Sequence, residues 1–109
     1  MEKLNDYQKA AYEFCSGKGK ETPLLAGALG MCGEAGECAE IVKKALFQGH
    51  EVNKDKMIEE LGDVMWYIAL TATGLGVTLE EIATYNIEKL SRRYPTGHFR
   101  KTDSTERKE

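Results

Sequence analysis

Two pairs of acidic residues could do chemistry, because each pair has helical spacing and lies beside apolar residues. Glu34 and Glu37 are three positions apart, and so are Glu60 and Asp63. On an α-helix this spacing places both carboxylates of a pair on one face. Carboxylates with apolar neighbours are costly unless they are paired or bind a cation, and neither pair has a basic residue four positions further along. One or two divalent cations would balance the four charges.

The residue types favour a hard cation at this site. Sites built from carboxylate oxygens alone select Mg²⁺ or Mn²⁺. A ferritin-like di-iron bundle would need a His three residues after a Glu, and neither His50 nor His98 has that spacing. The alternative is that the acids are ordinary solvated residues. Two pairs on successive long helices, both beside apolar stripes, favour the metal site over that alternative.

Candidate substrate-binding residues follow the second acid pair. Asn86, Lys89 and Arg93 form a row at i, i+3 and i+7. Asn86 is expected on the core side, since Ile82 and Leu90 lie four positions to either side of it. Alone, the row would be a solvated surface, but beside a metal site it can hold phosphate oxygens.

Trp66 and Tyr67 come soon after Asp63. Their rings can belong to the core or can stack on a base.

Four helices are expected to position these residues, which makes the fold class all-α. They cover residues 2–14, 23–47, 54–73 and 78–93. Pro23 suits the first position of the second helix, and caps are expected at Thr22, Asn53 and Thr78. Glycines and a proline mark the breaks, at Gly17, Gly19, Gly49, Gly74, Gly76, Pro95 and Gly97.

Two of these helices carry long apolar stripes that predict helix packing. The stripe of the second helix consists of Leu24, Ala28, Met31, Ala35, Cys38, Val42 and Ala45. The core face of the third consists of Ile58, Leu61, Met65, Ile68 and Ala72. Residues 64–70 are apolar on every side of that helix, which predicts burial all round. A chain this small needs a second copy of itself to surround such a helix.

The second helix also carries glycine at every third position, at Gly27, Gly30, Gly33 and Gly36. Each glycine costs a helix up to about 1 kcal/mol relative to alanine. Such a row indicates close approach of another helix or of a ligand.

Length and composition agree with one small soluble domain. The chain has 109 residues, of which 41% are hydrophobic and 30% charged. We expect a single domain over residues 1–99 and a charged, flexible tail over 100–109. The net charge of −3 argues against binding a nucleic-acid polymer, and no apolar run is long enough to span a membrane. Three cysteines, without a CxxC motif or a secretion signal, predict free thiols in the cytoplasm.

Together these segments resemble the MazG-like, all-α nucleoside triphosphate pyrophosphohydrolases. The family pattern is Glu-x-x-Glu, a variable spacer and Glu-x-x-Asp, which here reads GEAGECAEIVKKA and EELGDVMWYIA. NIEKLSRRYPTGHF resembles the family's C-terminal helix, where an Asn and a Lys contact the substrate. The resemblance runs from about Leu24 to Phe99. Two positions depart from it: Gly33 and Tyr85 stand where many members have an acid and a Lys.

The resemblance implies a four-helix, MazG-like bundle assembled as a homodimer or homotetramer. It also implies hydrolysis of a nucleoside triphosphate between the α and β phosphates, giving a monophosphate and pyrophosphate. The expected substrates are dNTPs or non-canonical NTPs. Mg²⁺ or Mn²⁺ would be held by Glu34, Glu37, Glu60 and Asp63, and Glu34 or Glu37 would activate water. The residues expected to contact substrate are Asn86, Lys89, Arg93, Tyr67 and Trp66.

Two other interpretations stay open at this point. The chain can be a non-catalytic helical module that binds nucleotide or only dimerises, and neutralising its acids would then cost no activity. It can also be an enzyme of related fold that acts on dUTP, dCTP or a phosphoribosyl-linked adenine nucleotide.

Overall fold

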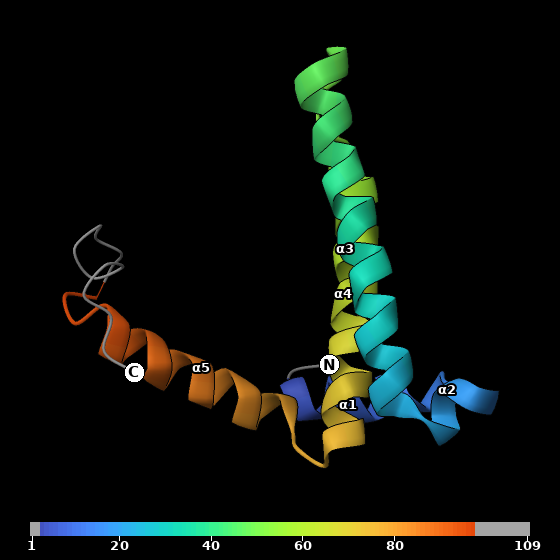
Figure 1. Ribbon diagram of the computed structural model, residues 1–109, viewed down its shortest axis with the longest axis vertical. Helices are drawn as coiled ribbons and strands as arrows, with labels where there is room; N and C mark the ends of the chain where they lie inside the picture. The colour runs from blue at the N-terminus through green and yellow to red at the C-terminus, as the bar shows by residue number, and fades with distance from the viewer. Residues whose placement is uncertain (1–2, 98–109) are drawn as a thin grey trace.

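The computed structural model describes residues 3–97, and all regular structure in that range is helical. The helices are α1 (Leu4–Glu13), α2 (Gly17–Glu21), α3 (Pro23–Gln48), α4 (Lys54–Leu75) and α5 (Leu79–Arg93) (Figure 1). The predicted all-α class is confirmed. None of these helices is long and apolar enough to cross a membrane. The predicted tail, His98 and Phe99 lie outside the described residues.

Local signals place the ends of the long helices. Asn53 Oδ1 accepts a hydrogen bond from Lys56 N at 3.0 Å, and Thr78 Oγ1 accepts one from Glu81 N at 3.0 Å. Two of the three predicted caps are therefore confirmed, since each of these side chains binds a backbone N–H that the first helical turn leaves free. At the other ends of α3 and α4, Gly49 and Gly76 adopt φ of 71° and 76°. Glycine adopts this left-handed conformation without a steric cost.

Three local predictions are wrong. The expected break at Gly17 and Gly19 contains the short helix α2. Gly17 redirects the chain with a φ of 56°, and a single helical turn follows it. Thr22 precedes α3 but makes no side-chain cap; its hydroxyl donates instead to Lys18 O at 2.6 Å. Gly74 lies inside α4, which continues for two residues beyond the predicted end, to Leu75.

The two longest helices, α3 and α4, form an antiparallel pair that is tight at one end only. A Cβ on Gly27 would lie 2.7 Å from Thr71 N and from Tyr67 O, and a Cβ on Gly30 would overlap the Tyr67 ring. A Cβ on Gly33 or on Gly36 would meet nothing within 4 Å. Glycine therefore permits close helix packing only at the first two positions of the row.

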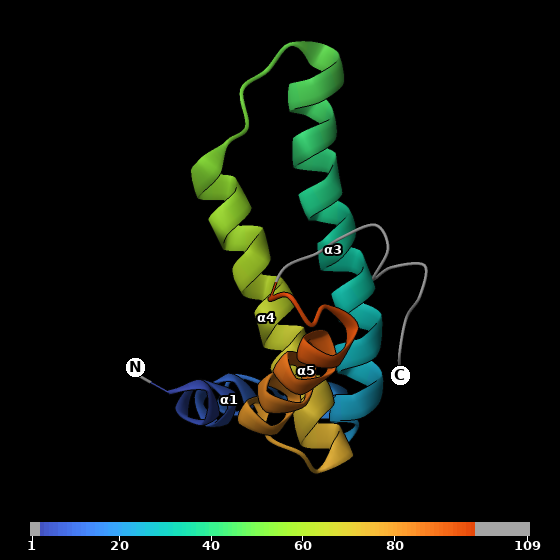
Figure 2. The same cartoon turned by 90° about the vertical axis from the view of Figure 1, so that its left-hand side faces the viewer.

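We call the tight region, residues 23–31 of α3 and 66–75 of α4, the closed end. We call residues 37–48 of α3, the connection 49–53 and residues 54–59 of α4 the open end. Figure 2 shows the two helices close together near α1 and further apart towards the connection.

The core lies at the closed end, where α1 packs across α4. It is small and built from Ala11, Ala69, Ala72 and Leu79, with Trp66 packed against it. Trp66 Nε1 donates to Ala11 O at 2.9 Å. Polar side chains join α1 to the start of α5, because Gln8 accepts from Leu79 N at 2.8 Å and donates to Val77 O at 2.9 Å. These bonds satisfy backbone groups that burial would otherwise leave unpaired.

The predicted stripes are covered only in part by a single chain. On α3, Met31, Cys38 and Ala45 are half-buried. The other stripe positions, Leu24, Ala28, Ala35 and Val42, are exposed. The face turned to α4 is rotated towards Gly27, Gly30, Glu34 and Ile41, because the glycines let the backbones approach there.

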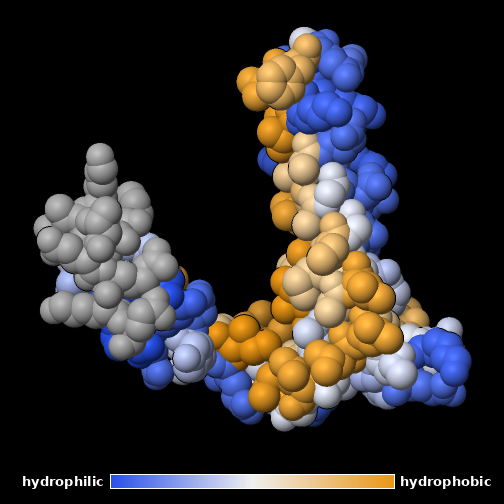
Figure 3. Space-filling model, in the orientation of Figure 1, coloured by the Kyte–Doolittle hydropathy of each residue, from blue (hydrophilic) through white to orange (hydrophobic). Residues whose placement is uncertain are grey.

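The α4 core face is also covered only at its C-terminal end. Ala72 is fully buried and Ile68 is half-buried, but Ile58, Leu61 and Met65 are exposed. Of the segment 64–70 that was predicted to be buried on every side, only Ala69 and Leu70 are buried, Met65 is exposed, and the other residues are half-buried. Figure 3 shows the remaining apolar surface along the side of the α3–α4 pair that faces α5.

The last helix, α5, is anchored only near its start. Leu79 is buried against the core, whereas Tyr85 and Ile87 are 65% and 63% exposed. Beyond that start, α5 extends away from the α3–α4 pair (Figure 1). Asn86 was expected on the core side, but it is exposed because no other part of the described chain covers the middle of α5.

Candidate metal centre

Three of the four predicted acids meet between α3 and α4. Carboxylate oxygens of Glu34, Glu60 and Asp63 lie within 4.8 Å of one another. Glu34 reaches α4 because it lies seven residues after Gly27, on the face where the helices touch. Glu60 is buried and the other two are half-buried. Bringing three carboxylates together in this setting requires a proton, a cation or both.

In the metal-free chain a proton meets part of that requirement. A hydrogen bond between the Glu34 and Glu60 side chains, together with desolvation and the charges of Glu60, Asp63 and Glu37, raises the pKa of Glu34 to about 7. The same hydrogen bond, with help from Lys56, lowers the pKa of Glu60. The shared proton therefore resides on Glu34. Because the three carboxylates retain a proton near neutral pH, a divalent cation can replace that proton and bind to the same oxygens.

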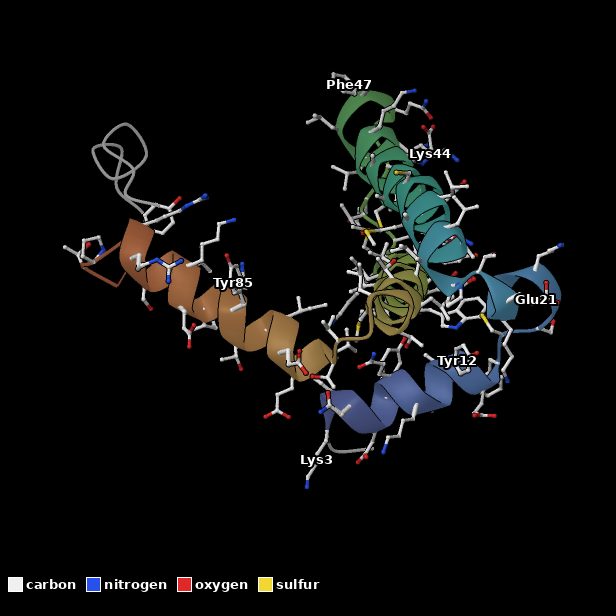
Figure 4. All side chains as sticks on the ribbon, turned by 60° about the horizontal axis from the view of Figure 1, so that its bottom comes forward. Lys3, Tyr12, Glu21, Lys44, Phe47 and Tyr85 are labelled. Carbon is white, nitrogen blue, oxygen red and sulfur yellow. The ribbon has the colours of Figure 1, made fainter. Side chains whose placement is uncertain are left out.

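The fourth acid, Glu37, is outside this cluster. It lies one turn along α3 and lines a cavity of about 470 Å³ at the open end. We call this the hairpin-end cavity; its lining includes Glu37, Glu40, Lys44, His50, Glu51 and Lys56. Figure 4 labels Lys44 on this half of α3, far from Tyr12 on α1. Glu37 thus faces a space beside the carboxylate cluster.

Two residues beside the cluster were missed by the sequence analysis. Lys56 Nζ lies 3.1 Å from Glu60 Oε1, at the position four residues before it. A lysine four residues before an acid lies on the same helical face as one four residues after it, so the sequence spacing indicates this pair. Tyr7 is brought near Asp63 by α1, and its pKa is raised by burial and by the Asp63 charge. No sequence pattern links Tyr7 to Asp63, because only tertiary packing brings α1 to α4.

The aromatic pair lies next to the cluster, on the closed-end side. Trp66 and Tyr67 have ring centroids 5.3 Å apart, and the Trp66 N–H is bound to α1. The Tyr67 ring packs where a side chain at Gly30 would stand. Both rings therefore have packing roles in the single chain, and substrate contact by either stays a prediction.

The row on α5 is not brought to the acids within one chain. Asn86 is exposed, and Lys89 and Arg93 are half-buried. Their helix extends away from the α3–α4 pair that carries the acids (Figure 1). A role for this row in binding phosphate stays a prediction.

The donor set fits a hard divalent cation. Three carboxylates from two helices supply oxygen ligands alone, which suits Mg²⁺ or Mn²⁺. Neither a histidine nor a cysteine is part of this cluster in the described chain. The di-iron alternative therefore has no support from the geometry.

Comparisons with known proteins place these residues in a family. A family profile described as the MazG nucleotide pyrophosphohydrolase domain matches residues 24–98, which include both acid pairs. The Gene 37 protein of Mycobacterium phage L5 is 44% identical over 73 residues, covering 63% of this chain and 64% of that protein. This chain therefore spans somewhat less than two thirds of that relative's length. No solved structure matches the chain.

Proposed function

The chain belongs to the MazG nucleotide pyrophosphohydrolase family, and from that premise we propose that it hydrolyses nucleoside triphosphates with Mg²⁺ at the α–β phosphate bond. The products are a nucleoside monophosphate and pyrophosphate. The proposed substrates are dNTPs or non-canonical NTPs. The observation that carries the proposal is the carboxylate cluster of Glu34, Glu60 and Asp63, which lies within the residues that match the family.

Each acid has a proposed role that follows from its position. Glu60 and Asp63 hold the cation from α4 and Glu34 holds it from α3, since their oxygens converge. A bound divalent cation supplies positive charge to the phosphates and a more acidic water. Glu37 lies outside the cluster but near it, so its carboxylate is the group we propose accepts the water proton. It need not give up a position on the cation to do so.

The remaining contacts are proposed to come from a second copy of the chain. In one copy the acids and the row of Asn86, Lys89 and Arg93 lie on separate arms. Much apolar surface also stays exposed, including Leu61 at 48% and Met65 at 45%. A homodimer or homotetramer would cover that surface and place α5 of one copy at the acids of another. Burial of apolar surface is the main interaction that stabilises such assemblies.

The reaction is tested by measuring pyrophosphate release over a panel of canonical and modified NTPs and dNTPs, with Mg²⁺ and with EDTA. We expect release only with the metal, together with one monophosphate per pyrophosphate. The ranking over the panel identifies the substrate. Absence of release from folded, oligomeric protein would contradict the proposal and favour a non-catalytic binding module.

The shared site is tested by mixing two inactive variants. Asp63→Asn should remove cation binding by the acids of the copy that carries it. Lys89→Gln should remove phosphate binding by the α5 of the copy that carries it. In a mixed oligomer one site would combine an intact acid cluster with an intact α5, so activity should return in part. Mixing each variant with itself is the matched control. No recovery, with subunit exchange demonstrated by a tagged copy, would place all site residues within one chain.

A further inference from the structure

The first turn of α5 is held by side chains of α1. A helix leaves its first backbone N–H groups without partners, and on α5 these belong to Leu79, Glu80 and Glu81. Gln8 Oε1 accepts from Leu79 N at 2.8 Å, and Asn5 Oδ1 accepts from Glu80 N at 3.1 Å. The third N–H is bound by the cap of α5 itself. Two of the three groups therefore depend on residues 71 and 75 positions away in the sequence, and Figure 4 shows the start of α5 beside the end of α1 that carries Lys3.

The amide of Gln8 joins three elements. Its Nε2 donates to Thr73 Oγ1 on α4 at 3.2 Å and to Val77 O in the connection at 2.9 Å, while its Oε1 binds α5. Asn5 repeats part of this arrangement one turn earlier, since its Nδ2 donates to Glu80 Oε2 at 3.4 Å. Each amide uses its oxygen and its nitrogen together, and a carboxylate in its place would lack the donor. We call Asn5 and Gln8 the α1 clasp.

The clasp holds a helix that has little hydrophobic packing of its own. Gln8 is buried, so losing a partner would leave a buried polar group unpaired. Leu79 is also buried, but most side chains from Ile82 to Arg93 are exposed. The direction in which α5 leaves the α3–α4 pair is therefore determined at its first turn, and hydrogen bonds there constrain it because they require a narrow range of angles.

A small rotation at the first turn of α5 becomes a large displacement at its far end. Arg93 is the last residue of α5 and lies about 21 Å along the helix from Leu79, at a rise of about 1.5 Å per residue. A rotation of about 15° at Leu79 would move Arg93 by about 5 Å. Such a displacement is larger than a hydrogen bond to a phosphate oxygen tolerates. Residues that fix the first turn thus control where the row on α5 can bind.

We propose that Asn5 and Gln8 are positioning residues for the reaction. By binding the first turn of α5 they fix the direction of that helix. They thereby place the row of Asn86, Lys89 and Arg93 of one copy at the acids of another. The part played by this row rests on the proposed function, whereas control of the direction of α5 by the clasp does not.

The direction of α5 is tested by a distance measurement without nucleotide. Spin labels are attached to Lys54→Cys on α4 and Glu88→Cys on α5, two exposed positions, after the native cysteines have been replaced by serine. Doubly labelled copies are diluted with unlabelled copies, so that double electron–electron resonance measures the distance within one copy. We expect one narrow distance distribution in the wild type. Gln8→Glu should shift or broaden that distribution by about 5 Å, because the far end of α5 moves with its first turn.

Two further variants make this test specific to the clasp. Lys9→Met changes the exposed neighbour of Gln8 on α1 and is the matched control, for which we expect the wild-type distance. Asn5→Ala removes the more exposed amide of the clasp and should give a smaller change of the same kind, which supplies the answer if Gln8→Glu does not fold. Wild-type distances in the folded clasp variants would overturn the proposal, because the direction of α5 would then be set elsewhere.

The consequence for the reaction is tested by mixing variants. We expect Gln8→Glu to lower kcat/KM for pyrophosphate release about tenfold or more and to leave Mn²⁺ affinity unchanged, since its acids are intact. Mixed with Asp63→Asn it should regain activity, because the α5 of the other copy can serve its acids. Mixed with Lys89→Gln it should not, because both copies then have an impaired α5. A general folding defect would not distinguish the two mixtures.

The remaining outcomes separate this proposal from the proposed function. If Asp63→Asn and Lys89→Gln do not restore each other, the shared site is wrong, and the positioning role is overturned with it even if the distances change. If they do restore each other but Gln8→Glu behaves alike with both, the clasp is a structural contact only. Changed distances with full activity in Gln8→Glu would overturn the proposal in the same way.

Discussion

The closed and open ends of the α3–α4 pair use similar apolar residues but differ in what surrounds them. At the closed end, glycines on α3 admit α4, and α1 adds Ala11 and Gln8 to the contact. Outward-facing apolar side chains are exposed at both ends, Leu29 at 67% and Phe47 at 75%, but the close approach of the two backbones is at the closed end. The carboxylate cluster lies between the two ends. The comparison indicates that the closed end holds the two helices together, while the open end leaves space through which a ligand can reach the acids.

The largest expected effect is on the acids themselves. Asp63→Asn should lower pyrophosphate release by about a thousandfold or more, because one ligand of the cation is lost. Glu37→Gln should also inactivate the protein but should leave Mn²⁺ binding close to that of the wild type. Turnover rates measured together with Mn²⁺ binding distinguish a lost cation ligand from a lost proton acceptor. Equal loss of Mn²⁺ binding in both variants would place Glu37 in the cluster with the other three acids.

A second prediction uses the glycine row, which spans the boundary between the two ends. Gly27→Ala should lower the free energy of unfolding by about 1–3 kcal/mol, because its methyl group would meet the backbone of α4. Gly33→Ala should instead raise it by up to about 1 kcal/mol, since nothing in the chain opposes the methyl group. Urea unfolding measures both. A destabilising Gly33→Ala would mean that a second copy occupies that face.

A third prediction weighs the contact of α1 at the closed end against the free surface of α5. Trp66→Phe should cost about 1 kcal/mol of unfolding free energy, because the hydrogen bond from Trp66 Nε1 to Ala11 O is lost. Tyr85→Phe, on exposed α5, is the matched aromatic control and should stay within about 0.5 kcal/mol of the wild type. If the control cost as much in thermal unfolding of the oligomer, the Tyr85 hydroxyl would have a hydrogen-bond partner in the assembly.

The last prediction is a pH dependence of stability in the metal-free protein. Glu34 has an ordinary pKa of 4.5 and a folded value of about 7. Between these values the folded chain keeps a proton that the unfolded chain has released. The stabilisation is complete below about pH 4.5 and is lost as the pH rises through about 7. The groups that face Glu34 are Glu37, Glu60 and Asp63, with Lys56 beyond Glu60.

The measurement is urea unfolding from about pH 5 to about pH 8 with EDTA and with Mg²⁺. With EDTA, stability should fall across this window. With Mg²⁺ the fall should vanish, because the cation replaces the proton. Glu34→Gln should remove the fall in either condition. Rising stability with EDTA would show that the proton is not shared between Glu34 and Glu60.

Local chemistry made most of the helices predictable. Asn53 and Thr78 cap α4 and α5 as expected, because a short polar side chain satisfies the first turn wherever it occurs. Gly49 and Gly76 end α3 and α4 for an equally local reason, the ease of a positive φ. The short helix α2 was missed, since a helix of a single turn leaves no periodic pattern.

Side-chain placement was harder to predict than helices. A heptad stripe gives the apolar positions of α3 but not the angle at which another helix meets them. Gly27 and Gly30 determine which face of α3 contacts α4. Glu34 lies on that face, whereas Val42 is exposed. Asn86 was expected on the core side of its helix and is exposed in the single chain for a similar reason, because periodicity identifies a face without showing what covers it.

The sequence by itself determined the helical class, the caps at Asn53 and Thr78, the family and the two acid pairs, because each depends on residues close together in the chain. Only the tertiary structure decided which acids meet, since Glu34 and Glu60 converge across two helices whose distance the glycines control. It also decided that Lys56 partners Glu60 and that Tyr7 lies near Asp63. Charges interact through space, and α1 and α3 reach α4 only after the chain has folded.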